Sequence, residues 1–386
     1  MRTRLWWLMT AMVTGCVASV WADYAADVQA GLRQLVLRLP ETAQVAALVA
    51  PALAQGGQAY LAGDRGFISE GWGRAGGMMT IKGLGSPDDL KANDVVLLGL
   101  LGEPSEADQR VIARAREVGA QVVLMGPESA ERWGCHYLPI AARTAGQGGL
   151  PTITPLLMAQ LWTFTGELVA ALTRLGKMPP MYQSILVPGG KERNAEHLKY
   201  TWEPETPAPV APIILGRTYL ARISSYLRTF TATQRDGLAE AARLAAETRR
   251  AGRTVWFACL GHLPPEIPAQ PGDPGLLEPL LSLEPEKLPE RVKPGDLIIY
   301  LGYYEPYGPW VEQTHAAGAL IVTIVAGTPQ RSAYEMGADL NLSGCWPFGD
   351  TTVDIPGYDV RLLPPSGFMQ AVQYFMVNEA LAAAGG

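Results

Sequence analysis

The sequence predicts an α/β protein in which two halves each contain a parallel sheet covered by helices. Three observations predict this fold class: continuous apolar runs that end in glycine turns, helical segments between these runs, and the repetition of this order in the second half of the chain. Strands of a parallel sheet are buried on both faces, and their sequences are therefore continuously apolar. With 386 residues, 48% hydrophobic and 18% charged, the chain is long enough for two domains and is not predicted to be disordered.

The first 22 residues have the pattern of an export signal. Two arginines precede an uncharged apolar stretch, and Val20-Trp21-Ala22 fits the residues before a signal-peptidase cleavage site. We expect removal of residues 1–22. The alternative is a lipobox that ends at Cys16, whose lipidation would attach the protein to a membrane. Either signal predicts an exported bacterial protein of the periplasm or cell envelope.

After this signal, two stretches of the chain repeat the same order of features. Each has an apolar run ending in a glycine turn, an Asp-led apolar strand ending in Gly-Glu-Pro or a similar turn, a helix end capped by Gly-Ala before another apolar strand, and a Pro-Thr or Pro-Ser turn before a long apolar helix. The paired segments are residues 56–66 and 251–262, 93–104 and 295–306, 117–129 and 316–329, and 150–172 and 364–384. The order predicts a sequential duplication.

Helical sequence opens each copy, over residues 23–54 and 216–250. Residues 177–214 between the copies are rich in proline and polar residues and have no sustained period, as is typical of a connecting segment. The predicted division is a first domain over 23–200, a linker over 201–214 and a second domain over 215–386.

Three local stretches, together with the order of the elements, carry a family resemblance. GWGRAGGMM (71–79), SILVPGGKERN (184–194) and GADLNLSGCWPFGDTTVDIPG (337–357) are similar to stretches of bacterial SIS (sugar isomerase) proteins. The chain resembles a tandem pair of SIS domains over essentially its whole mature length. The resemblance implies two three-layer αβα domains, each with a five-stranded parallel sheet between helices, and a phosphosugar ligand bound by an isomerase or a regulator.

The phosphate-binding turn of that family is altered in both copies. In SIS domains a Ser-x-Ser-Gly-x-Thr/Ser turn at the start of a helix wraps the phosphate. The matching turns here, residues 99–105 and 302–307, lack this serine pattern, and the first is followed by acidic residues that would repel a phosphate. Gly102 and Ser105 are the ligand-binding candidates that remain, although Ser105 with Asp108 also fits a helix-capping pair.

Aromatic residues crowd the second of these turns. Tyr303, Tyr304, Tyr307 and Trp310 follow a predicted parallel strand, at the edge where open α/β sheets bind their ligands. Aromatic faces suit a sugar ring, and tyrosine hydroxyls add directional hydrogen bonds. We therefore expect the three tyrosines to contact a sugar; packing between the two copies is the alternative.

The first glycine turn brings together groups that suit an anion. Gly63, Asp64, Arg65 and Ser69 supply backbone amides, one carboxylate and one cation. Since Arg65 is the basic residue of this turn, we expect it to contact any anionic group of the ligand. A solvated loop arginine is the alternative.

Candidates for proton transfer and the last ligand contacts lie near these turns. Aldose–ketose isomerisation needs a general base and an acid, and Glu70, His262 and Glu266 are the catalytic candidates. Thr152 and Ser366, each in the turn before a long apolar helix, complete the ligand-binding set. A structural role is the alternative for His262.

Composition and missing motifs exclude other classes. The net charge of −6 argues against nucleic-acid binding, and with four histidines and no nucleotide-binding or metal-ligand motif we expect neither a metal nor a cofactor. The expected function is an exported SIS-like protein that binds a sugar or sugar phosphate and has degenerate phosphate loops. The alternatives are a phosphosugar aldose–ketose isomerase with a rearranged site, and a periplasmic substrate-binding or protein-interaction module. A homodimer is left open.

Overall fold

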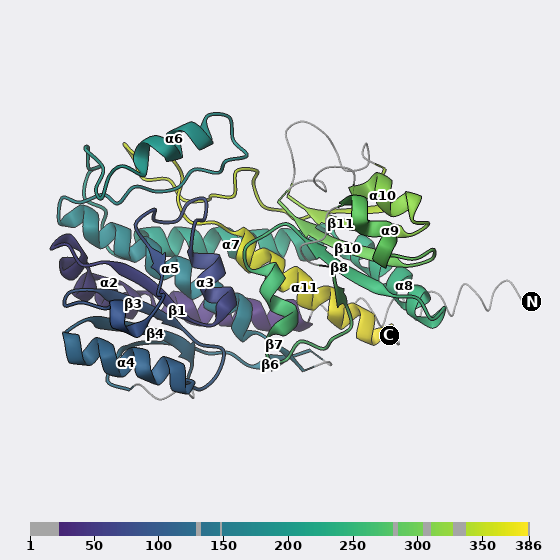
Figure 1. Ribbon diagram of the computed structural model, residues 1–386, viewed down its shortest axis with the longest axis horizontal. Helices are drawn as coiled ribbons and strands as arrows, with labels where there is room; N and C mark the ends of the chain where they lie inside the picture. The colour runs from purple at the N-terminus through teal and green to yellow at the C-terminus, as the bar shows by residue number, and fades with distance from the viewer. Residues whose placement is uncertain are drawn as a thin grey trace, which may run out of the picture.

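A computed structural model describes residues 23–128, 133–146, 149–280, 285–303, 310–326 and 337–384. The expected signal over residues 1–22 with Cys16, as well as Tyr304 and Tyr307, lies outside the described residues. The described part contains two five-stranded parallel sheets flanked by helices (Figure 1), which confirms the predicted α/β class.

The first sheet has the strand order β2-β1-β3-β4-β5, and every pair in it is parallel. Its strands are β1 (Ala59–Gly63), β2 (Lys82–Gly83), β3 (Val95–Gly99), β4 (Gln121–Pro127) and β5 (His136–Ile140). Its connections carry α3 (Arg65–Gly71), the 3-10 helix η1 (Pro87–Asp89) and α4 (Glu106–Val118). A short antiparallel pair, β6 (Thr144–Ala145) and β7 (Leu150–Pro151), follows the sheet.

The second sheet repeats this order as β9-β8-β10-β11-β12, again with all pairs parallel. Its strands are β8 (Val255–Cys259), β9 (Glu278–Pro279), β10 (Leu297–Gly302), β11 (Leu320–Val325) and β12 (Leu340–Ser343). Its helices are α8 (Arg235–Arg250), α9 (Leu288–Arg291), α10 (Trp310–Ala316) and the 3-10 helices η2 (Pro264–Ala269) and η3 (Pro285–Lys287).

The aspartate before the central strand has the same role in both sheets. Asp94 accepts hydrogen bonds from the backbone N–H groups of Gln58 and Lys91, both at 2.8 Å. Asp296 accepts the equivalent bonds from the second half, at 3.0 and 2.9 Å. Each aspartate thereby joins the turn before its own strand to the residue that precedes the neighbouring strand.

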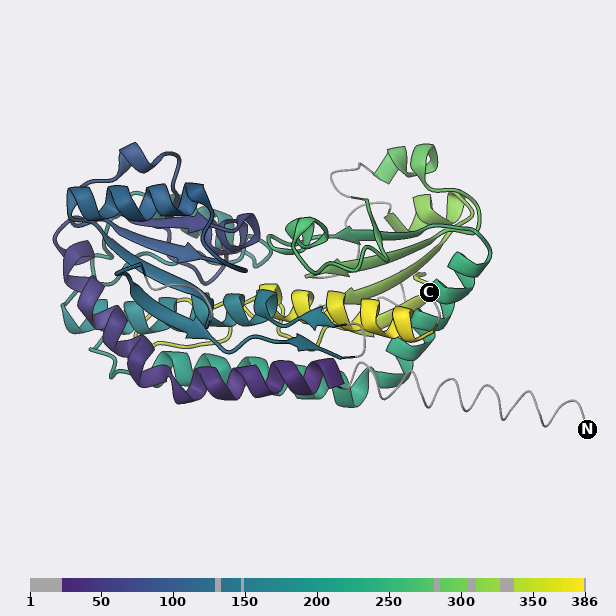
Figure 2. The same ribbon diagram turned by 90° about the horizontal axis from the view of Figure 1, so that it is seen from below.

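Long helices run along both sheets and join the two halves (Figure 2). They are a helix over residues 23–37, α2 (Leu39–Ala54), α5 (Ile153–Arg174), α7 (Ile214–Thr233) and α11 (Ser366–Ala383). α5 and α11 are buried along nearly their whole length, and one hydrophobic core extends from Tyr24 to Leu381 through both halves. Among the described residues, α5 alone has the length and apolar composition of a membrane span, and here it lies entirely within the protein core.

Candidate functional site

A cavity of about 830 Å³ lies at the carboxyl ends of the second sheet's strands. Its walls come from the loop after α3, from the segment that connects the two halves and contains α6 (Gly190–His197), and from the ends of β8, β10 and β12. The carboxyl edge of a parallel sheet is where α/β proteins bind ligands, and the volume is that of a small-molecule site.

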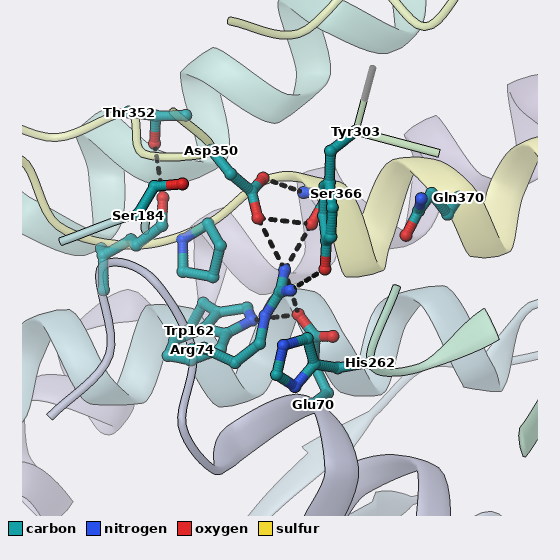
Figure 3. A network of polar contacts seen from close by, with 12 residues as sticks. Glu70, Arg74, Trp162, Ser184, His262, Tyr303, Asp350, Thr352, Ser366 and Gln370 are labelled. Carbon is teal, nitrogen blue, oxygen red and sulfur yellow. Dashed lines mark hydrogen bonds and ion pairs between the residues drawn. The ribbon is translucent and has the colours of Figure 1, made fainter. Parts of the chain in front are cut away.

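Arg74 is the centre of a polar cluster at this cavity (Figure 3). It is 2% exposed, and its Nη2 donates to Asp350 Oδ2 at 2.8 Å and to the hydroxyl of Ser366. Its Nη1 donates to the hydroxyl of Tyr303, and Nη2 lies 3.4 Å from Glu70 Oε1. One arginine of the first half therefore binds three side chains of the second half.

Glu70 is fully buried against the first turn of α11. Trp162 Nε1 donates to its Oε1 at 3.0 Å, and a Cβ placed on Gly367 would lie 2.2 Å from its Cδ, so this position of α11 requires glycine. Burial raises the pKa of Glu70 to about 7; the charge of Arg74 lowers this pKa and the charge of Asp350 raises it. Glu70 is thus poised to change protonation near neutral pH.

Asp350 holds the start of α11 from the opposite side. Its Oδ1 accepts from the backbone N–H of Ser366 at 3.1 Å, and its Oδ2 accepts from the Ser366 hydroxyl at 2.7 Å. Burial raises the pKa of Asp350, and Arg74 opposes this shift. Because one guanidinium balances only one carboxylate, the cluster is neutral when Glu70 carries a proton.

His262 adds a neutral imidazole to the cavity wall. Its Nδ1 lies 3.2 Å from the backbone carbonyl of Ser69, which can only accept a hydrogen bond, so Nδ1 carries the proton. Burial, with a smaller contribution from the charge of Arg74, lowers the pKa of His262 to about 3.

The structure brings together four of the residues singled out from the sequence. Glu70, His262, Tyr303 and Ser366 surround Arg74. They come from four separate stretches of the chain. Glu70 and His262 were predicted to be catalytic, and Tyr303 and Ser366 were predicted to bind ligand.

The residues of the first glycine turn lie outside the lining of the cavity, and Arg65 and Asp64 contact η2 and the residue that follows it. Arg65 is 85% exposed and forms an ion pair at 3.3 Å with Glu266, so these two candidates neutralise each other outside the cavity. Asp64 caps α3 and accepts a hydrogen bond at 3.0 Å from Gln270. Gly63 has a positive φ and packs against a carbonyl of β3, and Ser69 contributes its backbone carbonyl to His262.

The remaining candidates also lie outside the lining of this cavity. Ser105 and Asp108 form a reciprocal capping box at the start of α4, which is the alternative considered for that pair. The hydroxyl of Thr152 bonds to both the backbone N–H and the carbonyl of Arg143, each at 2.9 Å. Gly102 has open space around its Cα.

Sequence reasoning missed Arg74, Asp350 and Trp162. The first two lie within the stretches 71–79 and 337–357 that carried the family resemblance. The available signals were the lone arginine of the first stretch and, in the second, an aspartate that directly follows a glycine. Nothing in the sequence around Trp162 indicates its bond to Glu70.

The described residues contain no group of three or more His, Cys, Asp or Glu side chains that could hold a metal ion. Cys135, Cys259 and Cys345 are free thiols. Burial raises the pKa of Cys259 to about 12, so this thiol of the cavity wall is not a nucleophile at neutral pH.

Comparison with known proteins gives matches among solved structures. No family model and no curated protein sequence matches the chain. A protein described as sugar binding from Salmonella typhimurium LT2 has 12% identity and a TM-score of 0.49, with 92% of this chain and 97% of that one covered. Tagatose-6-phosphate ketose/aldose isomerase from Escherichia coli has 10% identity and a TM-score of 0.46, with 93% and 92% covered.

Glucosamine-6-phosphate deaminase from Thermotoga maritima is a third such structure, with 9% identity, a TM-score of 0.47, and 95% of this chain and 94% of that one covered. All three TM-scores are below 0.5. The fold class therefore rests on the strand order of the two sheets of this chain.

Proposed function

We propose that this is an exported, SIS-like protein that binds a neutral sugar derivative in the cavity at the second sheet. The observation that carries the proposal is the ion pairing of Arg74, which is the only Lys or Arg in the described lining of the cavity. Its charge is already compensated by Asp350 and Glu70, so a phosphate dianion would find no uncompensated cation there. Tyrosine and tryptophan side chains line the cavity, and aromatic rings suit the apolar face of a sugar.

The SIS-like assignment is supported by features that both halves share. The sheets have the same strand order, and Asp94 and Asp296 make equivalent bonds. We ascribe these features to a sequential duplication of one domain. The degenerate phosphate loop is consistent with Ser105, whose hydroxyl is used to cap α4.

Ligand binding is tested by thermal denaturation with a panel of neutral hexoses and the corresponding hexose 6-phosphates. We expect stabilisation by at least one neutral sugar, weakened by Trp346→Ala. The matched control is Trp202→Ala, a half-buried tryptophan outside the lining. Stabilisation by phosphates alone, abolished in Arg65→Ala, would contradict the proposal and point to the first glycine turn.

Export is a separate part of the proposal and has its own test. Fractionation of the native host, with N-terminal sequencing of the mature protein, should give a chain that begins at Asp23 in the periplasm. Release from the membrane by Cys16→Ser would instead assign the lipid anchor. An uncleaved protein in the cytoplasm would refute export.

A phosphosugar isomerase is the second candidate, favoured by the pKa of about 7 for Glu70 beside a neutral histidine. A general base is most effective when its pKa is near the working pH. Glu70 is not among the lining residues and adjoins the cavity through Arg74. Turnover of fructose 6-phosphate that is lost in Glu70→Gln would establish this activity.

A further inference from the structure

The wall of the cavity beyond the Arg74 cluster is apolar and aromatic. Tyr300 and Trp310 lie with ring centroids 6.1 Å apart, and the end of β8 contributes Cys259 and Leu260. Trp346, which is 4% exposed, follows β12 and contributes a further aromatic ring. Most of the surface of this wall is carbon, which can bury an apolar group but offers no hydrogen-bond partner to a hydroxyl group; the tyrosine hydroxyl and the indole N–H groups are its polar atoms.

The polar side chains of the connecting segment largely form hydrogen bonds within that segment. Both ends of the Asn194 amide bond to the backbone of Gln183, at 2.9 and 2.8 Å. The hydroxyl of Ser184 accepts from the backbone N–H of Leu186 at 3.3 Å. The polar groups that remain for a ligand are therefore concentrated near Arg74, His262 and the Gln183 side chain.

An exposed aliphatic side chain extends the apolar wall. Ile185 lines the cavity and is nevertheless 69% exposed, so a ligand that reaches it can remove additional apolar surface from water. A free monosaccharide that filled this space would bury hydroxyls against carbon, and a buried hydroxyl without a partner costs free energy.

We infer that the ligand is a neutral glycoside, a sugar joined to an alkyl or aryl group, with the sugar near Arg74 and His262 and the apolar group against Trp310 and Ile185. The inference rests on the proposed function and deepens it by naming the ligand class. Charge neutrality follows from the compensated cluster, and the apolar group follows from the composition of the wall.

Isothermal titration with glucose and with methyl, butyl and phenyl β-glucosides tests this inference, with the galactose and N-acetylglucosamine series run in parallel. Each methylene that is fully buried should raise affinity about fourfold, which corresponds to about 0.8 kcal/mol. The butyl glycoside should then bind up to about 60-fold more tightly than the methyl glycoside. The phenyl glycoside should also bind more tightly than the methyl glycoside.

Trp310→Ala should reduce, at least tenfold, the affinity gain of the butyl and phenyl glycosides over the methyl glycoside. Trp202→Ala, outside the cavity, should change neither. A free hexose that binds as tightly as its butyl glycoside overturns the glycoside inference and leaves the proposed function standing. Butanol or phenol that binds as tightly as the corresponding glycoside overturns the proposed sugar-binding function itself.

Discussion

Replacement of Arg74 by methionine removes the only positive charge within hydrogen-bond distance of Asp350 and Glu70 among the described residues. Both carboxylates are buried, so each then avoids an uncompensated charge by taking a proton. From its ordinary pKa of 3.8, protonating Asp350 costs about 5 kcal/mol at pH 7.5 and about 2 kcal/mol at pH 5. For Glu70, whose pKa is about 7, much of the free-energy cost of protonation is already present in the wild type.

We therefore expect Arg74→Met to lower the free energy of unfolding by about 4 kcal/mol at pH 7.5, within the range for breaking a buried ion pair, and by about half of that at pH 5. Urea unfolding followed by tryptophan fluorescence at both pH values measures the loss. Arg65→Met is the control: this arginine is exposed and paired with Glu266, so its loss should stay below about 1 kcal/mol at both pH values. An Arg74→Met loss as small as that of the control, or one that does not shrink at pH 5, would refute the reasoning.

Three further predictions concern the same cluster and the neighbouring loop. Folded Glu70 keeps its proton up to pH about 7, whereas the unfolded chain releases it near 4.5, so the free energy of unfolding of the wild type should fall by up to about 3 kcal/mol as pH rises from 5 to 8. In Glu70→Gln the urea midpoint should depend less on pH. The same slope of midpoint against pH in both proteins would contradict the assignment. Gly367→Ala should cost about 2 kcal/mol or more in chemical denaturation, because its Cβ meets the Glu70 carboxylate, whereas Gly102→Ala, with open space, should stay within about 0.5 kcal/mol. Ser105→Ala should cost about 1 kcal/mol as a lost helix cap and leave calorimetric sugar affinity unchanged; a loss of affinity would instead make Ser105 a ligand contact.

The strands and their alternation with helices were predictable because local sequence determines them. Val95–Gly99 and Leu297–Gly302 are apolar at every position and are buried at every position, as a parallel sheet covered on both faces requires. The aspartate before each of these strands was visible as a repeat in the sequence. Its bonds to two backbone N–H groups give the physical reason for that repeat.

The site was less predictable because its central residue depends on distant partners. Arg74 is separated by 276 residues from Asp350 and by 292 from Ser366, and an arginine in a glycine-rich loop is by itself typical of an exposed side chain. Arg65 was predicted to contact an anionic group because its local turn suggested a binding site, but its side chain extends into solvent. Tertiary contacts, which single-sequence patterns do not contain, decide which arginine is buried.

The packing of α5 and α11 has a consequence for the origin of the chain. Each is the long terminal helix of its half, the two contact each other, and each is buried almost completely by elements of both halves. A single half taken alone would leave one such apolar helix uncovered, and apolar surface of that extent is stable only against a partner. On the proposal that the chain arose by duplication of one half, the contact between α5 and α11 corresponds to the dimer interface of a single-copy ancestor, now held within one chain.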